Sequence, residues 1–398
     1  MNMLFKYAIP FILLLIANVC FSQKTLTVEE AVEKATKFSK NISAADQLVL
    51  QQKKLIKASV NLPNPEFFWE SPTGKFYTGF FTQSMEFPTV YGKQVQLQKQ
   101  QVVIAEKEKL RSASELSYQI RMLYLAAQYN EALVNELHLQ DSVFGKLQVA
   151  AQRQYEAGQI DYLQKTYTEN EYGDLHNQYE QSVIAGENLK AQLQYWTGTE
   201  EFFQLQPLTI MLLPDGLISI TDSLSFEQNP SVGILNQEII ASQKNLELQK
   251  SKALPGLAFG YFNQGERTTP TRLRFRAGLT IPLWFWQYKS GIQAAKIEKD
   301  VSVLKSEGFR QQLNSEMMNV NKELKVNLQS YNYFQKTGLP KSMEIINTAK
   351  RFFESGETDY INYLRNIGSS WQTKLKYLET INNININIIT IHFLTGKL

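Results

Sequence analysis

The side chains best suited to chemistry in this chain are its three histidines, His138, His176 and His392. A metal site usually needs two cysteines or histidines only about two to five positions apart. These histidines are widely separated, and the single cysteine, Cys20, lies near the start of the chain. No glycine-rich phosphate loop and no serine nucleophile motif is found. The sequence therefore predicts polar histidines on helix faces, no enzyme, no metal site and no bound cofactor.

Three arginines form the other distinctive group: Arg272, Arg274 and Arg276. They alternate with apolar residues over 272–281, and about ten residues of such alternation are typical of a transmembrane β-strand. An arginine facing lipid costs roughly 2–4 kcal/mol at the membrane midplane, so all three are predicted to face the lumen of a barrel. They would favour anions there unless Glu70, Glu86 or Glu266 neutralises them, and the sequence leaves both outcomes open.

The elements that must position these residues occur twice. Five residues recur 198 positions later (153 to 351) in the same order: Arg153, Glu156, Gly158, Asp161 and Tyr162 match Arg351, Glu354, Gly356, Asp359 and Tyr360. The segment 195–198 matches 393–396 at the same offset. Short solenoid repeats have periods of about 20–50 residues, so this is a half-molecule built twice.

Each half predicts a long helical hairpin. Residues 89–206 contain no proline, which costs about 3 kcal/mol inside a helix, and apolar residues recur there at steps of three and four. We predict hairpins over 92–198 and 291–396, with turns at Gly158 and Gly356, because glycine readily adopts the left-handed conformation that ends a helix.

Shorter elements precede each hairpin. Helices are predicted over 28–60 and 230–253, the first with a capping box formed by Thr27 and Glu30. Residues 199–224 contain prolines and glycine and are predicted to connect the first repeat, 23–198, to the second, 225–398.

Each half also predicts a pair of strands, at about 66–87 and about 257–283. Residues 283–286 read Leu-Trp-Phe-Trp, an aromatic cluster that suits a membrane–water interface. Strands of a soluble sandwich alternate in the same way and are the alternative. Four strands cannot close in lipid, whereas two chains supply about eight and three supply about twelve, which is wide enough for a lumen. The sequence therefore favours a trimer over a dimer if the protein conducts anything.

A removable leader is predicted at the start of the chain. Lys6 precedes an apolar run over 9–19, and Ser22 offers a small residue before cleavage, which is the pattern of a secretory signal peptide over 1–22. The alternative keeps Cys20 as a lipidated first residue. Removing 1–22 takes away one lysine, so the net charge falls from +3 to +2, which argues against a nucleic-acid partner.

Taken in order, these features resemble one family, the TolC-type outer-membrane factors of tripartite efflux systems. The most specific local match is an aromatic residue followed by two spacers and glycine, at 155–158 and 353–356, with Asp-Tyr three residues later. The resemblance covers the whole mature chain. It implies a mainly α protein with a small β part, whose homotrimer joins a 12-stranded outer-membrane β-barrel to a periplasmic α-helical barrel.

The resemblance also implies partners and a site. A periplasmic adaptor (a membrane fusion protein) and an inner-membrane pump would complete the system. The adaptor-docking and gate region at the hairpin tips would comprise Tyr155, Gly158, Asp161, Phe353, Gly356, Asp359 and Arg365. At the positions of the family's gate this chain has Phe353, Thr358, Asn362 and Arg365 instead, so an acidic gate is not expected there, although Asp161 or Asp359 could supply a nearby ring.

The predicted function is a passive outer-membrane duct that exports small solutes, either metal ions or drugs. The alternative is a periplasmic or surface coiled-coil protein without a pore. A pump adaptor would carry one hairpin, not two. The short chain is closer to the heavy-metal-resistance branch (cobalt-zinc-cadmium or copper-silver), which is a hint about the substrate only.

Overall fold

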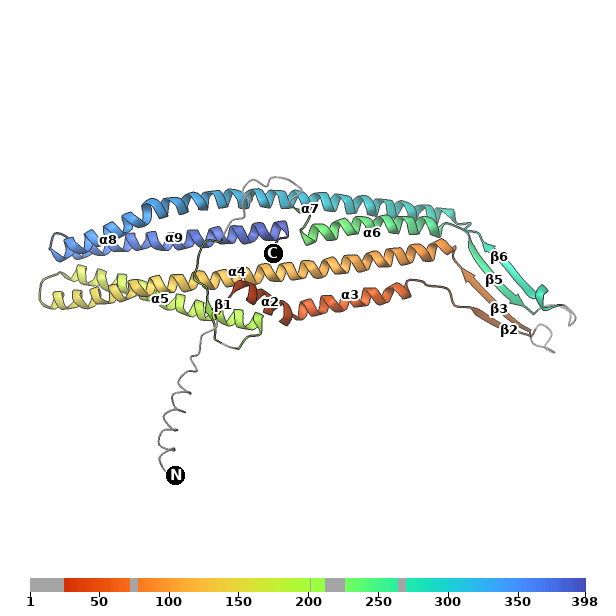
Figure 1. Cartoon of the computed structure of the whole chain (residues 1–398), viewed down its shortest axis with the longest axis horizontal. Coiled ribbons are helices and arrows are strands. Elements are labelled where there is room, and N and C mark those ends of the chain that lie inside the picture. Colours follow the sequence, from red (N-terminus) through yellow and green to blue (C-terminus); the bar gives the residue numbers. More distant parts are fainter. Residues whose placement is uncertain (1–24, 72–77, 201, 212–225, 264–269) are drawn as a thin grey trace, which may run out of the picture. The chain divides into compact units, whose positions relative to one another are not determined.

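The computed structural model describes residues 25–71, 78–200, 202–211, 226–263 and 270–398. The predicted leader with Cys20, most of the predicted connector and Glu266 lie outside these ranges. The elements in chain order (Figure 1) are β1 (Thr25–Leu26), α2 (Val28–Phe38), α3 (Lys40–Ala58), β2 (Glu66–Glu70), β3 (Thr78–Met85), α4 (Pro88–Glu156), α5 (Tyr162–Thr197), β4 (Gln204–Leu205), α6 (Pro230–Lys252), β5 (Gly256–Phe262), the 3₁₀ turn η3 (Thr271–Arg274), β6 (Phe275–Thr280), α7 (Phe285–Tyr333), the π-helical turn η4 (Phe334–Gly338), α8 (Leu339–Glu354) and α9 (Tyr360–Thr395).

The chain divides into two compact units, and each unit draws on both sequence repeats. Unit 1 takes its described residues from Met1–Phe38, Gln119–Leu212 and Lys325–Ile386. Unit 2 takes its own from Ser39–Tyr118, Leu213–Leu324 and Asn387–Leu398. Both hairpin turns therefore belong to unit 1, and the larger sheet belongs to unit 2. Within the described residues, no helix is both long enough and apolar enough to cross a bilayer.

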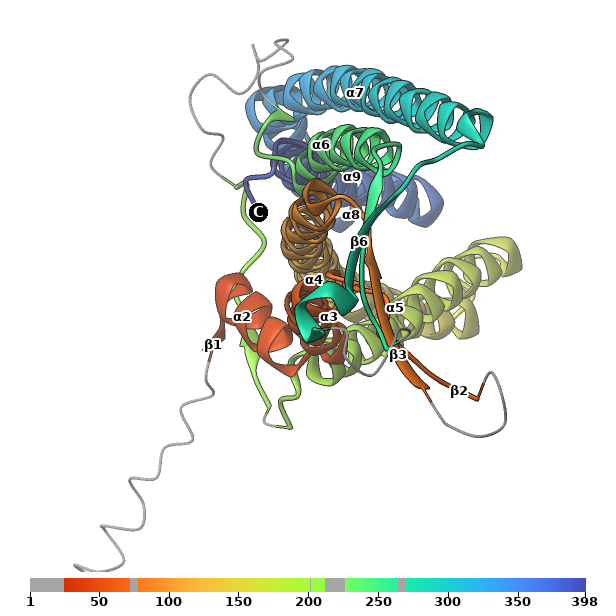
Figure 2. The same cartoon turned by 90° about the vertical axis from the view of Figure 1, so that its right-hand side faces the viewer.

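The sheet of unit 2 has four antiparallel strands in the order β2-β3-β5-β6, so one hairpin from each repeat meets at the β3–β5 pair (Figure 2). The predicted strand pairs are confirmed. The register places Phe67 opposite Phe81 and Leu257 opposite Leu279, on one face of the sheet. That face is apolar and exposed, and it also carries Trp69.

The other face of this sheet is more polar. Glu66 lies opposite Thr82, and Arg276 lies opposite Gly260. A partly aromatic patch completes this face, because the rings of Phe80 and Phe262 lie 5.4 Å apart. In β6 the alternation predicted from the sequence holds, with Phe275, Ala277 and Leu279 on the apolar face and Arg276, Gly278 and Thr280 on the other.

Two predictions about helix boundaries were wrong. The helix expected over 28–60 is broken at Ser39, whose extended backbone and Oγ, accepting from the Ile42 N–H at 3.3 Å, start a new helix. Helix α7 begins at Phe285, six residues before the expected start at 291, so two of the four residues in the predicted aromatic cluster are helical. By contrast, the capping box is confirmed, since the backbone N–H groups of Thr27 and Glu30 each donate to the other's side chain.

Unit 1 contains a small sheet that the sequence did not predict. Strands β1 and β4 are only two residues long and pair in parallel. Tyr124 of α4 fixes both, because its hydroxyl donates to the Leu26 carbonyl at 2.6 Å and accepts from the Gln206 N–H at 3.1 Å. Asn385 holds the start of the connector in a similar way. Its side-chain Nδ2 donates to Thr209 O at 2.7 Å, and its Oδ1 accepts from the Met211 N–H at 2.8 Å.

We expect Tyr124→Phe to loosen this small sheet. Phenylalanine keeps the buried ring but leaves the backbone groups of Leu26 and Gln206 without their partner, which costs about 1–3 kcal/mol. Hydrogen exchange of the β1 and β4 amides measures the loss. Tyr129→Phe is the matched control, because the Tyr129 hydroxyl has no hydrogen-bond partner in the described part of the chain. Equal protection in the two variants would contradict the role assigned to Tyr124.

Candidate functional site

The first hairpin tip joins α4 to α5 through a glycine-dependent turn. Gly158 has φ +69°, its N–H donates to Tyr155 O at 2.9 Å, and the next N–H donates to Gln154 O at 2.8 Å. This pattern closes the helix with a left-handed residue that only glycine adopts freely. Asp161 then starts α5 with a capping box, its Oδ1 accepting from the Gln164 N–H at 2.7 Å.

The second tip repeats this geometry between α8 and α9. Gly356 has φ +75°, and its N–H donates to Phe353 O at 3.2 Å. Asp359 accepts from the Asn362 N–H at 2.7 Å and from its side-chain amide at 2.9 Å. Both glycine turns predicted from the sequence are therefore confirmed. The two aspartates act as helix caps, so part of their hydrogen-bonding capacity is already used.

The surroundings of the two tips differ although the backbones match. Tyr162 is 64% exposed at the first tip, whereas the equivalent Tyr360 is 4% exposed at the second. Tyr360 stacks edge-on against Phe353, with ring centroids 4.8 Å apart, and its hydroxyl donates to Leu147 O of α4 at 3.2 Å. The second tip is thus anchored on α4, through a cluster containing Phe144, Ala151, Ala349, Tyr360, Tyr363, Leu364 and Ile367.

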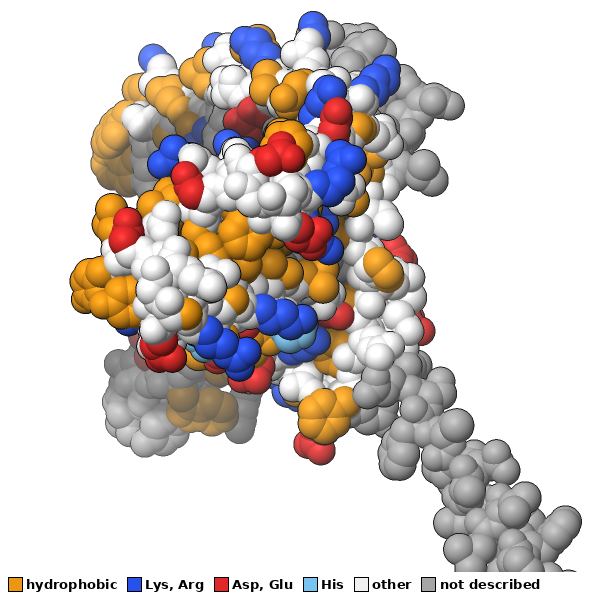
Figure 3. All heavy atoms as spheres, turned by 90° about the vertical axis from the view of Figure 1, so that its left-hand side faces the viewer, with side chains coloured by type: hydrophobic (Ala, Val, Ile, Leu, Met, Phe, Trp, Pro, Cys, Tyr) orange, Lys and Arg blue, Asp and Glu red, His pale blue; other side chains and the backbone are white. Residues whose placement is uncertain are grey.

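The exposed first tip carries an aromatic pair and a cation. The rings of Tyr155 and Tyr162 lie 5.9 Å apart, and the Lys165 ammonium lies 5.6 Å and 5.8 Å from their centroids. Figure 3 views the molecule from the hairpin ends, where acidic and basic side chains are interspersed with hydrophobic ones. Such an aromatic surface resembles the anchors of protein–protein interfaces more than a catalytic site.

Burial raises the pKa of several tyrosines near the tips. It raises the pKa of Tyr360, and the neighbouring Tyr363 acts in the same direction. Burial also raises the pKa of Tyr363, helped by the Glu354 carboxylate. Arg365 is exposed, and its positive charge opposes the burial that raises the pKa of Tyr167 on α5. Arg365 therefore lies close enough to the first hairpin to influence it.

The three arginines of the second repeat do not share one strand. Strand β6 begins at Phe275, and Arg272 and Arg274 lie in the preceding turn η3. Pro270 causes this change, because it accepts from the Leu273 N–H at 3.0 Å and starts a 3₁₀ turn instead of a ladder. Of the three arginines, only Arg276 therefore lies on the strand, where alternation places it on the more polar face of the sheet. Its guanidinium lies 4.4 Å from the Phe262 ring centroid.

The structure brings together two of the histidines that the sequence left apart. The rings of His138 and His176 lie 5.4 Å and 6.5 Å from the ring of Tyr179, and His176 Nδ1 is 2.9 Å from Asp141 Oδ1. Antiparallel pairing of α4 with α5 creates this group, which spacing alone could not reveal. Nowhere in the described ranges are three or more histidine, cysteine or acidic side chains placed to hold a metal ion.

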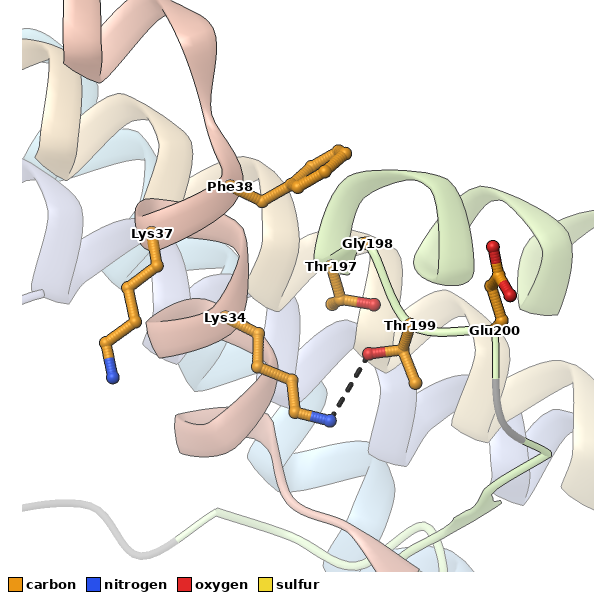
Figure 4. A pocket seen from close by; sticks show the side chains of 7 residues that line it. All are labelled: Lys34, Lys37, Phe38, Thr197, Gly198, Thr199 and Glu200. Carbon is orange, nitrogen blue, oxygen red and sulfur yellow. Dashed lines mark hydrogen bonds between the residues drawn. The ribbon is translucent and has the colours of Figure 1, made fainter.

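A cavity of about 670 Å³ lies beside the end of α5, lined by Lys34, Lys37, Phe38, Thr197, Gly198, Thr199 and Glu200 (Figure 4). The Lys34 ammonium donates to Thr199 Oγ1 at 3.2 Å. The Phe38 ring packs against Gly198, where any side chain would collide with it. This lining holds α2 on α5 and contains no nucleophile–base pair.

No protein-family model matches the chain, and no curated protein sequence matches it. Solved structures do match. CusC, whose structures concern transmembrane channel formation, aligns with TM-score 0.74 and 15% identity over 93% of this chain and 92% of that one. A membrane protein from Pseudomonas aeruginosa aligns with TM-score 0.79 and 12% identity over 94% and 91%. The CmeC outer-membrane channel of Campylobacter jejuni aligns with TM-score 0.75 and 14% identity over 93% and 85%. The chain shares its fold with these membrane and channel proteins.

The shared fold confirms the mainly α architecture with a small β part that the TolC-type resemblance implies. Its internal symmetry is clear in the second helices of the hairpins, because α5 and α9 each span 36 residues at equivalent positions. The first helices differ. Helix α4 is continuous, whereas the π-helical turn η4 interrupts the second repeat just before Pro340, which has no N–H to donate.

Proposed function

We propose that this protein is the outer-membrane channel of a tripartite efflux system, a passive duct that carries small solutes, either metal ions or drugs, to the exterior. The observation that supports it most directly is the fold shared over more than nine-tenths of the chain with solved outer-membrane channels. In this proposal the chain catalyses no reaction. The energy comes from an inner-membrane pump, and a periplasmic adaptor connects that pump to the hairpin tips.

The exposed apolar face of the sheet supports a membrane location. Phe67 is 76% exposed, Trp69 is 78% exposed and Phe275 is 67% exposed. Large aromatic side chains left open on a four-stranded sheet are unfavourable in water but suit hydrocarbon. Each strand hairpin begins and ends next to helices, so a hairpin that crosses the membrane and returns leaves its helices on one side. In this proposal that side is the periplasm.

The open edges of the sheet support a trimer. Within the described residues, strands β2 and β6 each have one edge without a partner, and unpaired backbone groups are costly in lipid. Joining β6 of one copy to β2 of the next satisfies both edges. Three copies then close twelve strands, which leaves room for a lumen. Arg276 faces that lumen in this arrangement, where Glu66 of the polar face is available to neutralise it.

The tips are proposed as the adaptor-docking and gating region, comprising Tyr155, Gly158, Asp161, Phe353, Gly356, Asp359 and Arg365. The asymmetry of the tips supports a division of roles. The exposed pair Tyr155 and Tyr162 is available to a partner, whereas Phe353 and Tyr360 pack inward. Opening would shift hairpins apart through a change of population driven by adaptor contacts.

We expect Gly158→Trp and Gly356→Pro to abolish transport while trimers still form. Tryptophan covers the tip surface, and proline cannot reach the φ of +75° at Gly356. The measurement is sensitivity to copper, zinc, cobalt, bile salts and dyes in cells that carry each variant in place of the natural protein. Gly158→Asn is the control, because asparagine tolerates the left-handed conformation and is small.

Two results would count against the proposal. Normal resistance in both variants would remove the docking assignment. A purified protein that is an elongated dimer without any need for detergent would instead support a coiled-coil protein lacking a pore.

A further inference from the structure

The turn η3 combines two arginines with an exposed apolar residue. Arg272 and Arg274 flank Leu273, whose side chain is 67% exposed. Arg272 is exposed and forms no ion pair with any other described residue. The turn precedes β6 at the end of the sheet opposite α6 and α7 (Figure 1). If the strands cross the outer membrane as proposed above, η3 lies at its outer rim.

The apolar surface continues from this turn along β6. Phe275 and Leu279 are exposed to nearly the same extent as Leu273, and Trp284 and Trp286 follow at the helix end. Residues 273 to 283 make ten steps, two in the 3₁₀ turn at about 2.0 Å each and eight beyond it at about 3.3 Å each. Their total of roughly 30 Å falls to about 23 Å at a tilt of about 40°, which is close to the height of about 25 Å of the apolar band of an outer-membrane barrel. Arg272 and Arg274 thus mark one interface and the two tryptophans mark the other.

Arg276, in the same segment, lies on the polar face of the sheet, which faces the lumen in the proposed trimer. It lies opposite Gly260, whose missing side chain leaves space, and its guanidinium packs on Phe262 of the polar face. Arg272 and Arg274 precede the strand, and Arg272 packs on no described aromatic ring. The contrast separates Arg272, in the turn before the strand, from Arg276, on the polar face of the sheet.

We propose that Arg272 and Arg274 bind the phosphate groups of anionic lipid headgroups at the outer rim, with Leu273 inserted among the acyl chains. This inference rests on the proposed membrane location. Guanidinium groups bind phosphate oxygens through paired hydrogen bonds. A lipid is the occupant because it alone places a phosphate directly beside hydrocarbon, as the adjacent Phe275 requires. The two arginines therefore serve as a lipid anchor and do not set ion selectivity.

The test uses the full-length protein purified in an uncharged detergent. Phosphatidylglycerol is titrated in, and the thermal unfolding midpoint is followed. Phosphatidylcholine and inorganic phosphate are titrated in parallel. We expect phosphatidylglycerol alone to raise the midpoint. In the double variant Arg272→Gln/Arg274→Gln the half-effect concentration should rise about 10-fold or more, since each basic residue near an anionic surface contributes roughly 5-fold.

Arg276→Gln is the matched control and should leave the phosphatidylglycerol response unchanged. Arg272→Lys should retain part of it, because the charge remains while the paired hydrogen bonds are lost. The inference is overturned if the double variant responds like the natural protein, or if inorganic phosphate gives the same shift. It is also overturned if the double variant alters single-channel ion selectivity, which would place the arginines in the lumen. A water-soluble particle that responds to no lipid would instead overturn the proposed function itself.

Discussion

Tyr360→Ala should open the second hairpin tip, whereas Tyr162→Ala should leave the first tip almost unchanged. The two tyrosines occupy equivalent positions, but Tyr360 is 4% exposed and Tyr162 is 64% exposed. Removing a large buried aromatic side chain costs about 3–5 kcal/mol, because contacts are lost and a cavity remains. An exposed substitution usually costs within about 0.5 kcal/mol. The same substitution in the two repeats therefore isolates the effect of packing.

Hydrogen exchange along α8 and the start of α9 measures this difference. A loss of about 3 kcal/mol corresponds to roughly 100-fold lower protection. Tyr360→Phe separates the hydrogen bond to Leu147 O from the ring packing and should cost only about 1 kcal/mol. Equal protection after both alanine substitutions would show that the second tip is not anchored on α4.

Alkaline pH gives an independent check on the same residue. Burial holds the pKa of Tyr360 above its ordinary value of 10.0, so the folded tip favours the neutral phenol. The stabilisation is complete below about pH 10 and is lost as the pH rises through the raised pKa. Tyr360→Phe should reduce this loss of protection at high pH, and Tyr363, whose pKa burial also raises, accounts for the loss that remains.

The sequence predicts the backbone of the tips well because the determinants are local. A glycine that must adopt positive φ and an aspartate placed to cap the next helix recur in both repeats. The packing around the two tips could not be predicted in the same way. The burial of Tyr360 depends on Leu147 and Phe144, more than 200 positions away, so a pattern within the tip could not reveal it.

The predicted strand alternation holds only where the backbone is hydrogen-bonded to a neighbouring strand. From Phe275 onward the register follows the expected pattern, but Pro270 starts a turn that occupies residues 271–274. The pair β1–β4 escaped prediction because two-residue strands have no periodicity to detect. The group formed by His138 and His176 escaped for another reason, since it requires knowing how α4 and α5 align.

Gly396→Ala should be the most destabilising glycine substitution in unit 2. Gly396 has φ +73°, and a Cβ there would overlap the carbonyl oxygen of Gln228 and lie 2.7 Å from Asn229 N. The left-handed conformation alone costs alanine about 1–2 kcal/mol. The overlap with backbone atoms adds to this, because they cannot rotate away as a side chain would, so we expect a total of about 3 kcal/mol or more.

The reason is that Gly396 packs against the start of α6. Asn229 caps that helix by accepting from the Ser231 N–H at 2.9 Å, and its side-chain amide donates to Leu394 O at 3.0 Å. Displacing the chain at Gly396 breaks this link between α9 and α6. Gly356→Ala is the matched control, because Gly356 has the same conformation with open space around it and should cost only the left-handed term. Thermal unfolding midpoints compare the two variants. Equal shifts would mean that the overlap at Gly396 is relieved without cost, whereas a larger shift in Gly396→Ala, matched by Asn229→Ala, would identify loss of the Asn229 link as the cause.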